Sequence, residues 1–184
     1  MTPPPGPRVL HLPTGETVTI LASGRDTGGA AFDVEAVLPP GLAGPPRHRH
    51  RAQTETFTVQ EGRLRVVVGR DVRVLSAGET AVVPPSVAHA FANPFDAPAR
   101  IRVQETPAGP LEEQFVALAG SGRIPPIGLL AAINVRHDLS FALDGVPDVV
   151  QGPAWRFLAW LHARGRGRRG GGPRHAPGTT SPVS

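Results

Sequence analysis

The sequence contains no cysteine, no tyrosine and no lysine, so all 19 of its basic residues are arginine. The absence of cysteine excludes disulfides, thiolate metal sites and cysteine nucleophiles. The absence of lysine excludes Schiff-base catalysis, and the absence of tyrosine excludes a tyrosine general acid. Any catalysis must therefore rely on other groups.

The sequence also lacks an excess of basic residues outside its C-terminal end. The formal net charge is +4, but residues 164–184 hold five arginines and no acid, so the rest of the chain sets 14 arginines against 15 acids. A near-neutral body does not provide the basic surface that proteins tracking nucleic acid need. No phosphate-binding loop and no DNA-binding helix-turn-helix motif is recognisable, and we expect no specific nucleic-acid partner.

Long apolar runs are missing as well. The longest one, residues 154–163, is too short to cross a bilayer and carries Arg156 and His162. The N-terminal residues lack the charged region and apolar stretch of a secretory signal. We therefore expect no membrane span and a cytoplasmic location.

Short segments of alternating polarity follow one another from residue 16 to residue 108, separated by glycine and proline turns. Val18 and Ile20 alternate with threonines, for example, and Ile101 and Val103 alternate with arginines. Alternation with a period of two is typical of β-strands. Roughly eight such strands without intervening helices predict an all-β sandwich or barrel.

Helical patterns begin only after this region. They predict helices at residues 110–119, 127–136 and 153–164, and the first and last of these begin at a proline, which is favourable there. The last one carries apolar residues around more than one face. A helix on the outside of a barrel buries only one stripe in its own chain, and an exposed apolar patch often marks an interface, so we expect a homodimer.

The predicted organisation has four parts. Residues 1–15 are proline-rich and predict a flexible N-terminal arm, and residues 16–108 form the β-domain. Residues 109–164 form an α-helical C-terminal extension. Residues 165–184, rich in arginine and glycine, predict a disordered tail because they have nothing to bury.

Three histidines and one glutamate form the candidate site: His48, His50, Glu55 and His89. Residues two apart in a strand face the same side, so His48 and His50 can point inward together. Glu55 lies an odd number of residues further on, so residues 51–54 must contain a bend. Glu55 then leads an apolar row, where an unpaired carboxylate is costly to bury. A bound metal would supply its partner.

Three imidazoles and a carboxylate are a ligand set for one divalent transition metal such as Mn, Fe, Co, Ni, Cu or Zn. The alternative interpretation is that each histidine only packs or forms hydrogen bonds. Three arginines beside the first two histidines (Arg47, Arg49 and Arg51) would also suit a solvated basic loop.

Two segments of the chain resemble the two conserved motifs of the cupin superfamily. The first motif has a glycine, a His-x-His pair, a glutamate and a later glycine. It is matched by His48, His50, Glu55 and Gly62, while the leading glycine is displaced to Gly41 or Gly44.

The second motif is matched by Gly78, Pro84, His89 and Asn93. Ser86 stands where the family usually has glycine, at a position that touches no ligand. Asn93 is expected to cap a turn rather than to bind the metal.

This resemblance implies an antiparallel double-stranded β-helix, or jelly-roll barrel, that holds one divalent metal. A six-coordinate metal with four protein ligands would keep two positions for a small-molecule ligand or substrate. Adjacent oxygen donors on that molecule would suit a metal-dependent dioxygenase-like reaction, with a metal-dependent isomerase or decarboxylase second. The rival interpretation is a non-catalytic ligand-binding or sensor barrel.

The surroundings of the metal should separate these alternatives. An enzyme should show an acid, base or arginine near the metal that is not a ligand, whereas a binding module needs only apolar walls. Gln53, Arg65 and Gln104 could reach the mouth of the pocket, although the alternation of strand residues turns Arg65 and Gln104 toward solvent.

Overall fold

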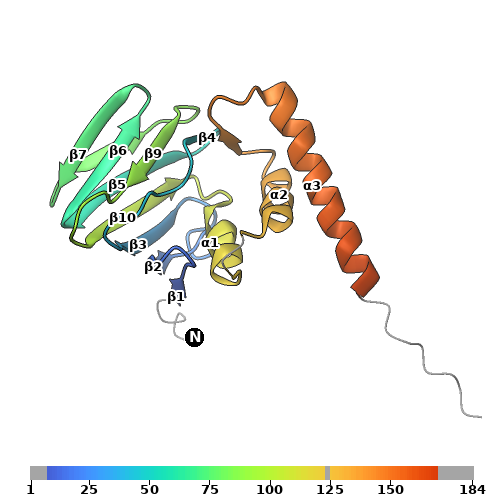
Figure 1. The fold of residues 1–184 in the computed structure, drawn as a ribbon, viewed down its shortest axis with the longest axis horizontal. Coiled ribbons are helices and arrows are strands. Elements are labelled where there is room, and N and C mark those ends of the chain that lie inside the picture. Colours follow the sequence, from blue (N-terminus) through green and yellow to red (C-terminus); the bar gives the residue numbers. More distant parts are fainter. Residues whose placement is uncertain (1–7, 123–124, 170–184) are drawn as a thin grey trace, which may run out of the picture.

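A computed structural model describes residues 8–122 and 125–169 of the chain (Figure 1). Strands come first along the chain, and helices dominate its last third. The elements are β1 (Arg8–His11), β2 (Thr17–Ala22), β3 (Phe32–Leu38), β4 (His48–His50), β5 (Thr54–Glu61), β6 (Arg63–Val68), β7 (Asp71–Ser76), β8 (Thr80–Val83), β9 (His89–Ala92), β10 (Ala99–Thr106), α1 (Leu111–Ala119), α2 (Ile127–Arg136), β11 (Phe141–Leu143) and α3 (Asp148–Arg169).

The strands form two sheets whose neighbours are all antiparallel. One sheet has the order β1-β2-β3-β10-β5-β8, and the other has the order β11-β4-β9-β6-β7. Apolar side chains from strands of both sheets join one buried cluster. The predicted antiparallel jelly-roll barrel with a helical C-terminal extension is thus confirmed.

The central strands β5 and β10 show why the alternating pattern folds in this way. Every second residue of each strand is buried, while those between are half-buried or exposed. The inner row of β10 runs from Ile101 through Val103 to Glu105, and that of β5 runs from Glu55 through Phe57 to Val59. Each inner row therefore carries one carboxylate among apolar side chains.

The three helices lie together on one side of the barrel, with α3 alongside α2 (Figure 1). The bounds of α2 are the predicted ones, but α3 begins at Asp148, five residues before the predicted start at Pro153. An acidic residue in the first turn stabilises a helix N-terminus. Pro153 therefore lies inside the helix, beyond the first turn, and donates no hydrogen bond to the turn before it.

Two short strands change the predicted organisation. Part of the predicted flexible arm is strand β1, which pairs with β2 over Arg8–His11. Strand β11 lies within the predicted helical extension and pairs with β4. Of the predicted tail, residues 165–169 continue α3, and residues 170–184 lie outside the described residues.

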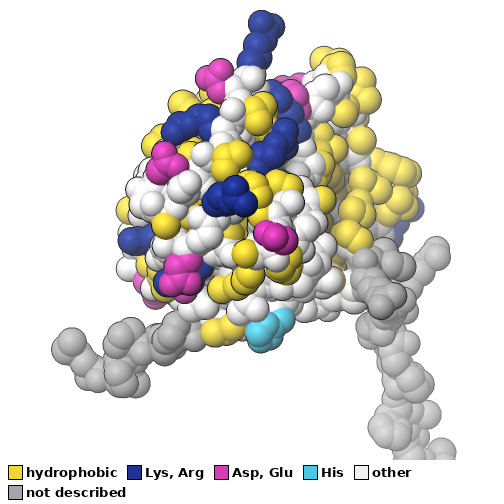
Figure 2. Space-filling model, turned by 60° about the vertical axis from the view of Figure 1, so that its left-hand side comes forward, with side chains coloured by type: hydrophobic (Ala, Val, Ile, Leu, Met, Phe, Trp, Pro, Cys, Tyr) yellow, Lys and Arg dark blue, Asp and Glu magenta, His cyan; other side chains and the backbone are white. Residues whose placement is uncertain are grey.

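Helix α3 leaves several apolar side chains in solvent, as the predicted homodimer requires. Phe157 is 58% exposed, and Trp160 and Leu161 are each 45% exposed. The homodimer itself stays a prediction. Among the helices that the structure describes, none is both long and apolar enough to cross a membrane. On the face drawn in Figure 2, acidic and basic side chains are interspersed rather than gathered by sign.

Two glycines precede the site in the loop between β3 and β4, and both have a positive φ, of 72° for Gly41 and 73° for Gly44. A Cβ at Gly44 would lie 1.8 Å from the main-chain oxygen of Phe91, in the strand that carries His89. A Cβ at Gly41 would meet nothing within 4 Å. Gly44 is thus the position at which the loop must lack a side chain to pack against β9.

This difference gives a matched pair of variants. Gly41→Ala should lower the free energy of unfolding by about 1–2 kcal/mol, the cost of a left-handed backbone at a non-glycine residue. Gly44→Ala adds a clash with the main chain and should cost at least about 4 kcal/mol, in the range of severe core damage. Urea unfolding of both variants measures this. Equal losses would contradict the packing role of Gly44.

Candidate metal centre

Strands β4 and β9 place the three histidines side by side. The two strands are neighbours in one sheet, and His48 lies directly opposite His89 in their register. Within β4 the two histidines are buried while Arg49 between them points outward, as their spacing predicts. A three-residue strand with alternating sides is therefore enough to aim both imidazoles into the barrel.

Glu55 reaches the same point from the opposite sheet. The chain bends over residues 51–53, where the odd spacing predicts a bend, and enters β5 in the other sheet. Ser86 N–H donates to the oxygen of His50 at 2.6 Å beside this bend. Ser86 has a φ of 64°, the left-handed conformation that explains why related motifs place glycine here.

The four predicted ligands come together inside the barrel. One possible ligand atom from each of His48, His50, Glu55 and His89 lies within 4.8 Å of all the others. Glu55 Oε2 is 2.7 Å from Nε2 of His89 and 3.5 Å from Nε2 of His50. All four residues are buried, with at most 6% of their surface exposed. The cluster could therefore hold a metal ion.

Main-chain carbonyl groups orient two of the imidazoles. The oxygen of Pro46 lies 2.8 Å from Nδ1 of His48, and the oxygen of Val87 lies 3.1 Å from Nδ1 of His89. A carbonyl only accepts, so Nδ1 is the donor in both rings and Nε2 is turned toward the cluster. Metal-binding histidines commonly have such an outer hydrogen bond. Nδ1 of His50 has no hydrogen-bond partner in the described part of the chain.

Burial and mutual contact set the charges of the cluster. Burial lowers the pKa of His48 to about 4, which leaves it neutral as a metal ligand must be. Burial alone would raise the pKa of Glu55, but hydrogen bonds and charges from His50 and His89 outweigh it and hold the pKa well below its usual range. The same contact raises the pKa of His50 despite its burial. A neutral imidazole and an ionised carboxylate fit the donor set of a divalent transition metal.

A second carboxylic acid, Glu105, lies beside the cluster and was not singled out from the sequence. It stands opposite Glu55 in the register of β10 and β5, so the two side chains share the inner face. Glu105 is completely buried. Its Oε2 accepts the N–H of Gly109 at 2.8 Å, while Oε1 has no hydrogen-bond partner among the described residues. Strand parity after Ile101 and Val103 was the signal that could have identified it.

Burial is also the main influence on the acidity of Glu105. It raises the pKa of the carboxyl to about 7, although the Gly109 N–H and the charge of His50 act in the opposite direction. The group can therefore exist in either protonation state near neutral pH.

Phe141 of β11 was also not predicted from the sequence as part of the site. Its ring stacks on His48, with centroids 4.8 Å apart and planes at 27°, and meets the ring of His50 edge-on at 6.2 Å. Among the three predicted neighbours of the site, Gln53 is buried and accepts a hydrogen bond from Ser140. Arg65 is exposed and Gln104 is half-buried.

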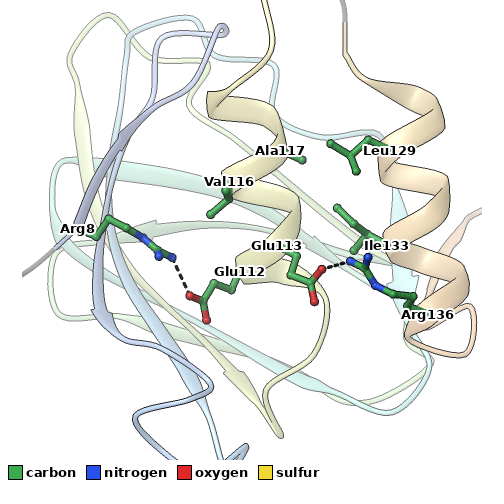
Figure 3. Close-up of a pocket in the computed structure, with 8 residues that line it drawn as sticks. All are labelled: Arg8, Glu112, Glu113, Val116, Ala117, Leu129, Ile133 and Arg136. Carbon is green, nitrogen blue, oxygen red and sulfur yellow. Dashed lines mark hydrogen bonds and ion pairs between the residues drawn. The ribbon is translucent and has the colours of Figure 1, made fainter. Parts of the chain in front are cut away.

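A cavity of about 300 Å³ lies away from the cluster, between α1 and α2 (Figure 3). Its polar side chains are already paired, Arg8 with Glu112 and Arg136 with Glu113. None of the four predicted ligands lines it. This cavity is therefore separate from the candidate metal centre.

Comparison with known proteins supports the same assignment. A family model described as the cupin domain matches residues 34–103, which include all four predicted ligands. The resemblance to the cupin superfamily is thus confirmed over these residues. No curated protein matches the chain.

Several solved structures are similar to this chain. An RmlC-like cupin from Shewanella frigidimarina is 21% identical, with 56% of this chain and 86% of that one covered and a TM-score of 0.48. A sugar phosphate isomerase of the cupin superfamily from Silicibacter pomeroyi is 29% identical, with 52% and 62% covered and a TM-score of 0.46. A predicted oxalate decarboxylase from Thermotoga maritima is 17% identical, with 55% and 92% covered and a TM-score of 0.47.

The acidity of Glu105 predicts a pH dependence of stability. Its pKa is raised in the folded chain from 4.5 to about 7, so its stabilising contribution is complete below about pH 4.5 and is lost as the pH rises through 7. Relative to Glu105→Gln, the metal-free protein should lose roughly 2–3 kcal/mol of unfolding free energy between about pH 5 and pH 8.

Urea unfolding of both proteins across this pH range measures the effect, and the variant serves as the control for every other titrating group. A constant difference between the two proteins from acid to alkaline pH would show that Glu105 keeps an ordinary acidity.

Proposed function

We propose that this protein is a metal-dependent enzyme that acts on a small molecule with two adjacent oxygen donors. The proposal rests mainly on Glu105, a buried carboxyl group that lies beside the ligand cluster without belonging to it. A barrel that only binds a metal needs the ligands and apolar walls. An acid whose free oxygen has no described partner is the feature expected of an enzyme.

Each of the four cluster residues would supply one ligand atom. The carbonyl groups that hold His48 and His89 fix their rings, and Glu55 provides the negative charge. A bound divalent metal would act as a Lewis acid toward the oxygen atoms of the substrate. The apolar inner rows around the cluster would exclude water from the bound molecule.

Glu105 would hold and move a proton. The Gly109 N–H fixes one carboxyl oxygen and thereby orients the other, Oε1. A carboxyl that is protonated in part of the molecules near neutral pH can give a proton to substrate or accept one from it. Isomerisation and decarboxylation both require such a transfer, so Glu105 favours them.

Dioxygenase-like chemistry, the leading expectation from the sequence, depends on the metal and does not need this acid. It is retained as the alternative reaction class within the same proposal. Uptake of dioxygen distinguishes it from proton transfer.

The burial of the cluster favours the non-catalytic alternative. All four predicted ligands are nearly inaccessible, and Phe141 lies against two of them. A sensor or storage site could be closed in this way, whereas an enzyme must admit its substrate. Turnover measurements decide between these functions.

Metal binding is the first requirement of the proposal. The purified chain should bind one divalent transition metal per chain, and His50→Ala should weaken binding more than about 100-fold, since loss of an outer-shell partner alone costs about 10- to 100-fold. His11→Ala, which removes an exposed histidine that contacts Thr17, is the matched control. Competition titration against a chelator measures both affinities. Equal affinities of His50→Ala and the original chain would contradict the site.

Turnover tests the enzyme proposal. Small molecules with adjacent oxygen donors are offered to the Mn, Fe, Co, Ni, Cu and Zn forms, with and without dioxygen. Glu105→Gln should retain the metal and lower kcat at least about 100-fold, the usual contribution of general acid–base catalysis. Unchanged kcat would remove Glu105 from the reaction. Binding of a ligand without turnover by any metal form would establish the non-catalytic alternative.

A further inference from the structure

Strand β4 carries two of the predicted ligands but is weakly attached to the barrel. On one side it pairs with β9 at a single position, His48 opposite His89. On the other side all three of its residues pair with β11, which belongs to the C-terminal extension. Figure 1 shows β11 between the barrel and the helices. The extension therefore supplies most of the strand pairing that fixes His48 and His50.

Side-chain amides from two helices hold the free edge of β11. Buried Asn134 of α2 donates to the oxygen of Phe141 and accepts its N–H, both at 2.9 Å. Buried Gln151 of α3 accepts the N–H of Leu143 at 2.9 Å and donates to its oxygen at 3.3 Å. These amides occupy the hydrogen-bonding positions that a further strand would use. The helices thereby fix the position of β11.

Further contacts beyond both ends of β4 and on its outer face strengthen its attachment to the extension. Arg51 N–H donates to the oxygen of Ser140 at 2.8 Å, and the N–H of Asp144 donates to the oxygen of Arg47 at 3.0 Å. On the outer side, Asp148 pairs with Arg49 at 2.5 Å and with Arg51 at 3.0 Å. The arginines beside the histidines thus bind the extension instead of forming a solvated loop.

Phe141 covers the inner side. It lies opposite His50 in the strand register, so its ring projects to the same face as the imidazoles. It stacks on His48, and on the helical side it meets the ring of Trp155 at 6.3 Å. An aromatic ring held between the helix and the histidines restricts both the movement of His48 and the path of solvent to the cluster.

We infer that the C-terminal extension is part of the metal centre, with Phe141 as a positioning residue that aligns the histidines of β4 and seals the bound metal from solvent. This inference rests on the proposed metal site. In this arrangement the C-terminal extension controls how fast the metal is exchanged.

The release of Co²⁺ from the loaded full-length chain to an excess of chelator tests the inference. Phe141→Ala should accelerate release about 10- to 100-fold, the effect usual for outer-shell partners of metal ligands. Phe157→Ala makes the same substitution at an exposed position of α3 and should release Co²⁺ at the original rate. Asn134→Ala keeps the ring of Phe141 but removes the hydrogen bonds to the main chain of that residue, and should also accelerate release.

Leu75→Ala is the control for general destabilisation, because Leu75 is fully buried in β7 at the opposite end of the same sheet. It should lower the melting temperature without accelerating release as Phe141→Ala does. If Phe141→Ala does not fold, Asn134→Ala carries the test. Release from Phe141→Ala or Asn134→Ala within about twofold of the original rate, or equal acceleration by Leu75→Ala, overturns the inference. Failure of the original chain to bind Co²⁺ would instead overturn the metal site itself.

Discussion

The carboxylate of Glu55 is the charge around which this barrel is arranged. It is buried at the head of an apolar row, where an isolated carboxylate would be expensive to desolvate. Contacts with His89 and His50 offset that cost, and they are possible only if β5 of one sheet faces β4 and β9 of the other. The bend at residues 51–53 and the close approach of Gly44 to β9 both serve this convergence.

The same requirement connects the helices to the barrel. Because β4 is only three residues long and has one pairing position with β9, the barrel alone holds it poorly. Strand β11 supplies the missing neighbour, and Asn134 and Gln151 fix β11 to the helices. The extension is therefore a structural element of the candidate site and not an appendage to it. Glu105, which lies opposite Glu55 in the neighbouring strand β10, adds a carboxyl group that is not needed as a metal ligand.

The parts of this structure that could be predicted from the sequence are those encoded locally. Period-two alternation identified the strands, and two short motifs brought His48, His50, Glu55 and His89 to one expected point. The same parity argument applied to β10 would have found Glu105. It fails at β7, where Val72 and Val74 alternate with Arg73 but are exposed, because the buried residue of this strand is Leu75 and places its inner face on the other set of alternating residues.

Strand β11 could not be predicted, because three residues carry no usable period and their partner strand lies about 90 residues earlier in the chain. Phe141 was missed for the same reason. The start of α3 was misplaced because a proline that can begin a helix can also be accommodated within its early turns, as Pro153 is.

The central claim is that three imidazoles and one carboxylate bind a single metal inside the barrel. X-ray absorption spectroscopy of the chain loaded with one equivalent of Zn²⁺ tests it most directly. The account predicts a coordination shell with the multiple-scattering signature of three imidazoles, together with oxygen, at about 2.0–2.2 Å. A shell made only of oxygen atoms, or one with a single imidazole, would contradict it.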